Sequence, residues 1–312
     1  KENLQFILNW LEKFPQYRNS DLFLARESYA GHYIPQLTKL YIFYINYFTI
    51  LKLYLGNPLL DLEISVKSAD YLWSHGVISD ELLTMKRTIC DETKLLLESI
   101  HNNTSKECLD VWELTNEEMG SDTDMGDLLA PICVSSIGNI PDPCLTDRIN
   151  MYLNKPEVQK ALHANITHLP YVWDFCLGLV LSAFHFLSCD LAINIIPVLS
   201  NILKAHIQVL LYSGDQDTKI SLSQTRKIAK LLVRDLKLVA LDKYGPWYDG
   251  LQIGGWSQSF GGLREGKNVA YLTFATVRGA AHEVPYTSPS QALTLFRAFL
   301  RGHPPPRRNN TI

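Results

Sequence analysis

Hydrophobic residues at the start of the chain recur at helical spacing. They follow an i, i+3, i+4, i+7 pattern, at Leu4, Ile7, Leu8, Leu11 and Phe14. This pattern is typical of an amphipathic helix that buries one face, and Pro15 is expected to end it. The first predicted element is therefore a helix that leads into a more apolar part of the chain.

A short apolar run follows at 22–25 and stops abruptly before Ser28. Small residues come within three positions of this serine, which is typical of a strand, a tight turn and a helix, because small side chains let the two backbones approach. We expect the helix at 31–41 and a second buried strand at 48–55, closed by a turn. The three elements indicate a strand–helix–strand unit.

From 62 to about 200 the pattern becomes mostly helical and irregular. This segment holds all six cysteines and three of the four Asn-x-Ser/Thr patterns. We expect a cap at 62–200, inserted into a single α/β domain that covers 1–306, with a disordered tail at 307–312.

Sheet character returns after the expected cap. A continuous apolar run at 207–212 predicts a strand buried on both faces, and 270–277 predicts the last strand. The segment 289–301 has its apolar residues on one helical face. Strands that alternate with helices in this way predict the α/β class.

Composition narrows the function classes. The chain has 312 residues, is 46% hydrophobic and carries a formal net charge of −3, which is typical of a soluble globular protein. The most apolar run, 40–51, is too short for a bilayer span and is interrupted by Asn46. We therefore expect neither a nucleic-acid nor a membrane partner.

Cysteines and glycosylation patterns favour an oxidising, secretory compartment, although buried thiols and chance patterns are the plain alternatives. The acceptor patterns are at Asn102, Asn103, Asn165 and Asn309. The chain begins at Lys1 with no apolar leader before it. We expect a processed product or a chain that lacks its N-terminal part.

Three residues of one catalytic chemistry follow three predicted strands, in the order Ser28, Asp217, His282. A serine hydroxyl becomes a good nucleophile when an imidazole takes its proton, and a carboxylate must orient that imidazole. The order serine, acid, histidine is that of α/β-hydrolases. Taken alone, each residue is better explained by an ordinary polar loop or surface position.

The sequence segments around these residues resemble those of the serine carboxypeptidase family. ESYAGHYIPQL is similar to its nucleophile segment, LLYSGDQDTKISLSQTR to its acid segment and TVRGAAHEVPYTSPSQALTLFRAFLRG to its histidine segment. The similarity extends from Leu4 to Pro306 and is nearest to the plant serine carboxypeptidase-like proteins. It implies the α/β-hydrolase fold, a mostly parallel sheet flanked by helices, with a helical cap.

The resemblance also implies roles. Ser28 would be the nucleophile, His282 the general base and Asp217 the acid that orients it, while the backbone N–H of Tyr29 would donate to the oxyanion. Glu27 would bind the C-terminal carboxylate of the substrate, together with a second glutamate that shares its proton, and this needs acidic pH.

A disulfide pairing follows from the same resemblance. It implies bonds Cys90–Cys108 and Cys133–Cys144, and it leaves Cys176 and Cys189 as free thiols or as an adventitious pair.

The chain departs from the family pattern at several points. Arg26 and Ala281 replace glycines, and an apolar segment replaces part of the cap. The printed sequence does not contain the family's Asn-Gly-Gly-Pro-Gly loop, which supplies the second oxyanion donor, nor the second glutamate. We expect Arg26 to strain the turn at Ser28 and the chain to have low activity.

The resemblance implies a hydrolase that releases C-terminal residues from peptides. Two alternatives stay open: a family acyltransferase or hydroxynitrile lyase, and a catalytically silent secreted glycoprotein. The expected substrates are peptides or small acyl compounds, without a metal or cofactor, and a homodimer is an open alternative.

Two further patterns have simpler interpretations. The glycine-rich segment 261–268 lacks the hydroxyl residue of a phosphate loop, and we expect a hairpin or surface turn there. His163 and His168 have no cysteine or carboxylate at ligand spacing, so a metal site is not expected. Trp247, Tyr248 and Trp256 are expected to pack in the core or against the cap.

Overall fold

The computed structural model describes residues 2–44, 51–134, 143–165, 167–174, 192–264 and 266–308. The predictions for Cys176, Cys189 and Asn309 lie outside these residues. In the described part of the chain, no helix has both the length and the apolar character needed to span a membrane.

The described residues form helices and strands. The helices are α1 (Glu2–Lys13), a 3₁₀ turn η1 (Pro15–Tyr17), α2 (Ala30–Tyr44), α3 (Leu62–Ser65), α4 (Ala69–Ser74), α5 (Asp80–Thr88), α6 (Glu92–Ile100), α7 (Lys106–Met119), α8 (Leu145–Leu153), α9 (Pro156–Ala161), α12 (Ile196–Lys204), α13 (Leu222–Asp235), α14 (Val284–Thr287) and α15 (Pro289–Leu300). The strands are β1 (Leu22–Glu27), β2 (Leu51–Gly56), β3 (Gln208–Gly214), β4 (Val239–Ala240), β5 (Gly245–Asp249), β6 (Gln252–Arg264) and β7 (Lys267–Val277).

The strands form one mixed sheet in the order β1-β2-β3-β7-β6-β4, and β5 pairs with β6. Strands β1, β2, β3 and β7 are parallel, whereas β6 is antiparallel to β7. Because parallel strands present their carboxyl ends at the same edge, the loops after β1, β3 and β7 meet there. The α/β class and the α/β-hydrolase architecture predicted from the sequence are confirmed.

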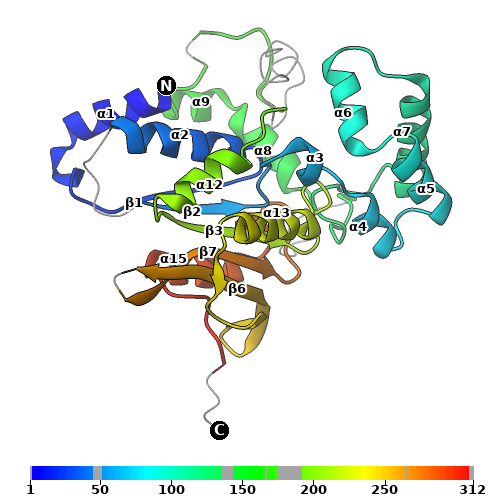
Figure 1. Cartoon of the computed structure of the whole chain (residues 1–312). Coiled ribbons are helices and arrows are strands. Elements are labelled where there is room, and N and C mark those ends of the chain that lie inside the picture. The colour runs from blue at the N-terminus through cyan, green and yellow to red at the C-terminus, as the bar shows by residue number, and fades with distance from the viewer. Residues whose placement is uncertain are drawn as a thin grey trace.

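Helices cover both faces of the sheet (Figure 1). Leu53, Leu211 and Phe274 pack in one cluster with α12 and α13. On the other face, Tyr54 and Tyr212 pack in a second cluster with α15. Alternate residues of β2 and β3 therefore pack in the cores on opposite faces of the sheet. Because both faces are buried, these strands have continuous apolar sequences.

The antiparallel part of the sheet was only partly predicted. Residues 261–264 pair with residues 267–270 in the β6–β7 hairpin, as expected. The full length of β6 was not predicted, because its polar and glycine-rich sequence is typical of a loop. Trp247 is fully buried over this strand and donates its indole N–H to the carbonyl of Thr276 at 2.9 Å. A Cβ on Gly254 would overlap the Trp247 ring, so packing requires glycine there.

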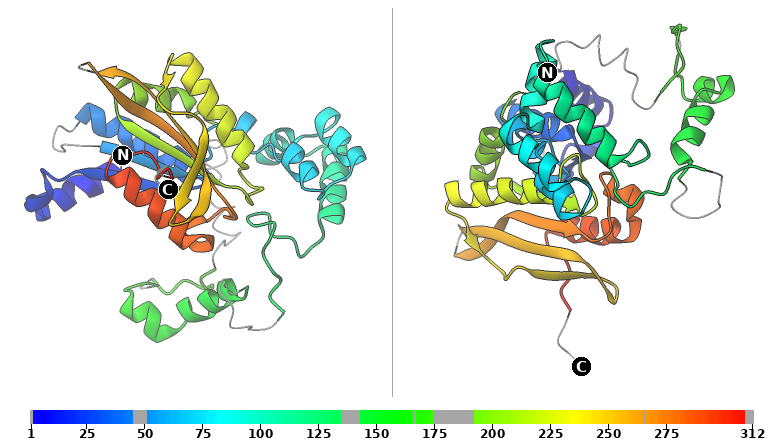
Figure 2. Two further views of the ribbon diagram at one scale, coloured as in Figure 1. Left: turned by 90° about the horizontal axis from the view of Figure 1, so that it is seen from below. Right: turned by 90° about the vertical axis from the view of Figure 1, so that its right-hand side faces the viewer.

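Two groups of helices lie away from the sheet, within the segment predicted as a cap. Helices α4–α7 form a group to one side, and α8 and α9 form another (Figure 2). The first group has its own small core around Leu72, Leu82 and Val111.

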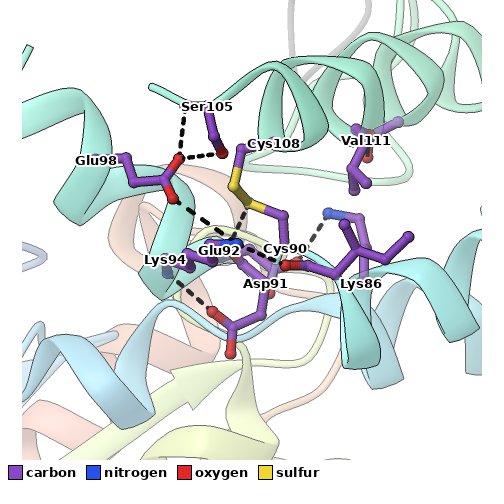
Figure 3. Close-up of a disulfide and its surroundings, with 11 residues drawn as sticks. Lys86, Cys90, Asp91, Glu92, Lys94, Glu98, Ser105, Cys108 and Val111 are labelled. Carbon is purple, nitrogen blue, oxygen red and sulfur yellow. Dashed lines mark hydrogen bonds and ion pairs between the residues drawn. A yellow bond between two sulfur atoms is a disulfide. The ribbon is translucent and has the colours of Figure 1, made fainter. Parts of the chain in front are cut away.

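Both predicted disulfides are present, Cys90–Cys108 and Cys133–Cys144. Figure 3 shows the first, which joins the chain after α5 to α7, beside an ion pair of 3.1 Å between Lys86 and Glu92. Because the core around it is small, this crosslink is expected to matter for stability.

Replacing Cys90 and Cys108 together by serine is expected to lower the free energy of unfolding of α4–α7 by about 3 kcal/mol, since the bond closes a loop with a sequence separation of 18. Urea unfolding under non-reducing conditions measures the loss. An unchanged transition midpoint, or a peptide map of the unreduced parent chain that links Cys90 elsewhere, would contradict the assignment.

The start of the predicted tail is anchored in the described structure. Arg307 donates to the carbonyls of Pro246 at 2.8 Å and Ser257 at 2.9 Å, and it pairs with Asp242 at 3.1 Å. Residues 309–312 lie outside the described part of the chain.

Candidate active site

Ser28 occupies a tight turn between β1 and α2. Its φ of 60° lies in the left-handed region, which is uncommon for serine. Its N–H donates to the carbonyl of Gly56 at 3.0 Å, and its own carbonyl accepts from the N–H groups of Gly31 at 2.9 Å and Leu59 at 3.0 Å. A Cβ on Gly31 would overlap the Leu59 carbonyl, so this turn requires glycine at position 31. The predicted elbow is present.

Arg26, which was expected to strain this elbow, lies on β1 directly before Glu27. Arg26 keeps the parallel register of β1, opposite Leu55, and its side chain is exposed. The other substituted position, Ala281, is buried and has a negative φ, and its N–H donates to the hydroxyl of Thr287 at 3.0 Å. Both replacements fit the local backbone.

A buried carboxylate orients the candidate general base. Asp217 is fully buried in the loop after β3, and its Oδ2 accepts from Nδ1 of His282 at 2.7 Å. The other oxygen, Oδ1, accepts from the backbone N–H groups of Lys219 at 2.8 Å and Ile220 at 3.3 Å. With Nδ1 as the donor, Nε2 is left as the basic nitrogen of a neutral ring.

Ser28 and His282 line the same pocket, which has a volume of about 900 Å³. Glu27 and Lys219 also line it, together with an apolar wall that includes Tyr54 and Phe296. The structure thus brings the candidate nucleophile and base to one cavity and hydrogen-bonds the candidate acid to the base. Tyr29, the candidate oxyanion donor, directly precedes α2, whose N-terminal dipole favours negative charge nearby.

Asn57, which follows β2, ties the acid and histidine loops together. Its side-chain amide donates to the carbonyls of His282 at 2.5 Å and Ala281 at 3.3 Å, and its Oδ1 accepts from the N–H of Gly214 at 3.0 Å. Asn57 is fully buried and has a φ of 38°, which asparagine tolerates better than most residues. In the sequence, Asn57 was expected only in the turn that closes the strand at 48–55. The available signal was an asparagine in a turn directly after a buried strand, because asparagine tolerates the left-handed conformation.

A loop after α7 supports the same residues from the cap side. The carbonyl of Gly126 accepts from the N–H of His282 at 2.7 Å, and the carbonyl of Met125 accepts from the hydroxyl of Thr218 at 2.5 Å. Nothing in the local sequence indicated this contact, because 93 positions separate Met125 from Thr218.

Glu27 is a half-buried residue that lines the pocket beside Ser28. The hydroxyl of Tyr212 donates to its Oε1 at 2.9 Å. Burial raises the pKa of Glu27 above its ordinary value, against the opposing effects of the Tyr212 hydrogen bond and the charge of His282. Glu283 and Asp217 add to the rise, because a second negative charge nearby disfavours ionisation.

This shift predicts a pH dependence of stability. Because the folded-state pKa of Glu27 is raised, the folded protein binds the proton more tightly than the unfolded chain, and stability falls as pH rises from the ordinary glutamate value through the raised one. Replacing Glu27 by glutamine should remove this loss, so the variant gains stability relative to the parent as the pH rises above the ordinary glutamate pKa of 4.5. Urea unfolding across this range measures the difference, with the exposed Glu113→Gln as control. A constant difference across pH would contradict the assignment.

The predicted glycosylation sites Asn102, Asn103 and Asn165 have exposed side chains. His163 and His168 are exposed as well, and the described residues contain no group of three or more metal-ligating side chains.

Comparison with known proteins shows the family of this chain. The family model described as serine carboxypeptidase matches residues 1–302. Two similar relatives are the Arabidopsis thaliana proteins serine carboxypeptidase-like 44, at 38% identity, and serine carboxypeptidase-like 42, at 39% identity. Each match covers 99% of this chain and 66% of the relative. The chain therefore spans about two thirds of the length of these relatives.

A solved structure gives the same result for the fold. The crystal structure of Kex1(delta)p, a prohormone-processing carboxypeptidase from Saccharomyces cerevisiae, superposes with a TM-score of 0.63 at 18% identity, over 95% of this chain and 65% of the yeast chain. At this identity the likeness concerns the fold alone. The family model matches residues 1–302, which include the whole described sheet and the candidate site. The chain therefore belongs to the serine carboxypeptidase family.

Proposed function

We propose that the protein is a serine-type carboxypeptidase-like hydrolase, which releases C-terminal residues from peptides through an acyl-enzyme. The observation that carries this proposal is the buried hydrogen bond of 2.7 Å between Asp217 and His282, beside a pocket that His282 shares with Ser28. Nucleophilic acyl transfer needs this combination of side chains.

In the proposed reaction, the Ser28 hydroxyl attacks the carbonyl carbon of the scissile bond while Nε2 of His282 takes its proton. The N–H of Tyr29 donates to the resulting oxyanion, and Asp217 stabilises the imidazolium. His282 then returns the proton to the leaving amine as the C–N bond breaks. Water, deprotonated by His282, attacks the Ser28 ester and releases the acid, which restores both residues.

Glu27 supplies the specificity for a free C-terminus in this proposal. Because its pKa is raised, Glu27 keeps its proton to a higher pH than an ordinary glutamate, and the protonated group can donate a hydrogen bond to the substrate carboxylate. An ionised Glu27 would repel that carboxylate, so affinity should fall as pH rises through the pKa of Glu27.

The test is an assay of the purified chain near pH 5 with a blocked dipeptide that has a free C-terminus. Turnover is expected to be low, because the printed sequence does not contain the loop with the second oxyanion donor. A serine-directed covalent inhibitor should stop this turnover and label Ser28, as mass spectrometry of its peptide reports. Transfer from a glucose ester or cleavage of a hydroxynitrile, in place of peptide hydrolysis, would favour the alternative family chemistries. If the chain shows no turnover and Ser28 is not labelled, the result would favour a silent glycoprotein.

We also infer that the protein passes through the secretory pathway, given two disulfides and three exposed acceptor asparagines. Expression in plant cells should yield a chain whose mass falls after glycosidase treatment, with deamidation of Asn102, Asn103 or Asn165 marking the occupied sites. An unchanged mass and unmodified peptides at all three sites would contradict this.

A further inference from the structure

Tyr212 lines the candidate pocket together with Glu27. Its ring crosses the end of β2, where a Cβ on Gly56 would overlap the ring carbons and the hydroxyl oxygen. The hydroxyl then donates to Oε1 of Glu27 at 2.9 Å. Glycine at position 56 is therefore what lets a side chain of β3 pass β2 and contact β1.

The ring has little freedom to move. Tyr212 is 1% exposed and packs with Tyr54, at 4.5 Å between ring centroids, in the core that also contains Trp247 and Val277. Packing therefore fixes the position of the Tyr212 hydroxyl, and the hydrogen bond to this hydroxyl fixes the position of the Glu27 carboxyl group.

We propose that Tyr212 is a positioning residue, whose hydroxyl engages Oε1 of Glu27 and thereby directs the other oxygen, Oε2, toward the C-terminal carboxylate of the substrate. The inference rests on the proposed function of the pocket.

The chemistry of a protonated carboxyl group supports this assignment. Such a group has one carbonyl oxygen, which accepts well, and one hydroxyl oxygen, which donates. Because Tyr212 donates to Oε1, that oxygen is the carbonyl and the proton resides on Oε2. Without Tyr212, both oxygens are equivalent and the proton is no longer directed to the substrate side.

Several groups surround Glu27 and share in its titration. Tyr212 comes from β3 and Tyr54 from β2, His282 and Glu283 come from the loop after β7, and Asp217 and Lys219 come from the loop after β3. Among these, Tyr212 makes the direct hydrogen bond to the carboxyl group, and this bond favours the ionised form. Its removal therefore raises the pKa of Glu27 further.

The test uses Tyr212→Phe, which removes one oxygen atom and keeps the ring, and Tyr271→Phe as the matched control. Tyr271 is a similarly buried tyrosine on β7, and it does not line this pocket. The substrates are a blocked dipeptide with a free C-terminus and the methyl ester of the same compound, which lacks the carboxylate.

For Tyr212→Phe near pH 5, KM for the dipeptide is expected to rise about 3- to 10-fold, the size of one lost hydrogen bond, with kcat little changed. The steep rise of KM with pH should also move to higher pH. Hydrolysis of the methyl ester should be unaffected, and Tyr271→Phe should match the parent. An equal loss for both substrates, or an unshifted pH profile, would show that Tyr212 only packs the core and would overturn the proposal.

Gly56→Ala provides a second route, because its methyl group must displace the Tyr212 ring without changing the ring itself. It should reproduce the carboxylate-specific loss, whereas Gly262→Ala, where a Cβ would make only an ordinary contact of 3.8 Å, should not. Retention of parent KM by folded Gly56→Ala would argue against the proposal.

A direct titration separates this inference from the proposed function. The ¹³C signal of the Glu27 carboxyl carbon, assigned by its loss in Glu27→Gln, can be followed with pH whether or not the chain turns over substrate. A higher midpoint in Tyr212→Phe supports the proposal that the hydrogen bond from Tyr212 controls the protonation of Glu27. If the parent chain shows no turnover but the midpoint still rises in Tyr212→Phe, only the proposed function is overturned. An unchanged midpoint in Tyr212→Phe would overturn the role of Tyr212.

Discussion

Replacing Ser28 by alanine is expected to lower kcat for peptide hydrolysis by about 10⁴- to 10⁶-fold. Without the hydroxyl there is no acyl-enzyme, and direct attack by water is left with only the oxyanion donor and substrate binding to assist it. Because Ser28 and His282 act as a unit, His282→Ala should cost a similar factor, and the double variant should be little worse than either single one.

Steady-state assay of the three variants near pH 5 measures these losses. Ser20→Ala serves as control, since Ser20 is an exposed serine just before β1. Thermal unfolding checks that each variant folds. Inhibitor-sensitive turnover by folded Ser28→Ala at the parent rate would show that another residue is the nucleophile.

Replacing Asp217 by asparagine is expected to lower kcat by about 10⁴-fold through the wrong imidazole tautomer. Two backbone N–H groups, of Lys219 and Ile220, donate to Oδ1, so the amide oxygen of the variant must occupy that position. The amide NH₂ then faces Nδ1 of His282 and donates to it. The ring proton is thereby forced onto Nε2, which can no longer accept the proton of Ser28.

The matched control is Asp215→Asn, two residues earlier in the same loop. Oδ1 of Asp215 accepts from the N–H of Gly279 at 2.7 Å and belongs to a different hydrogen bond from the one that orients His282. This variant should keep its activity within about tenfold. Equal losses in the two variants would mean that the loop as a whole, and not the tautomer of His282, carries the effect. Inhibitor labelling of Ser28 should fall in Asp217→Asn in parallel with kcat.

Local sequence patterns predicted a large part of the architecture. Continuous apolar runs predicted the central strands β2 and β3, because strands buried on both faces have no polar side. The stop at Ser28 followed by small residues predicted the elbow, and the chain order of Ser28, Asp217 and His282 indicated the α/β-hydrolase site. Resemblance to the family supplied the disulfide pairs, which spacing alone leaves open.

Strand β6 could not be predicted because its residues owe their place to a partner far along the chain. Gly254 and Gly255 form strand here since the Trp247 ring and the carbonyl of Thr276 lie where side chains would be. Propensity counts such glycines as loop, and only the packed sheet reverses that preference.

The sequence by itself determined which elements form and which residue types end the parallel strands, since periodicity and turn chemistry act over a few neighbouring positions. The tertiary structure decided the connections between strand ends. Tyr212 meets Glu27 across 185 positions, and Asn57 bridges to His282 across 225. Both contacts depend on the order β1-β2-β3-β7 in the sheet, in which β2 lies between the strand of Glu27 and the strand of Tyr212. Strand order sets which side chains meet at the sheet edge, and no local pattern in the chain encodes it.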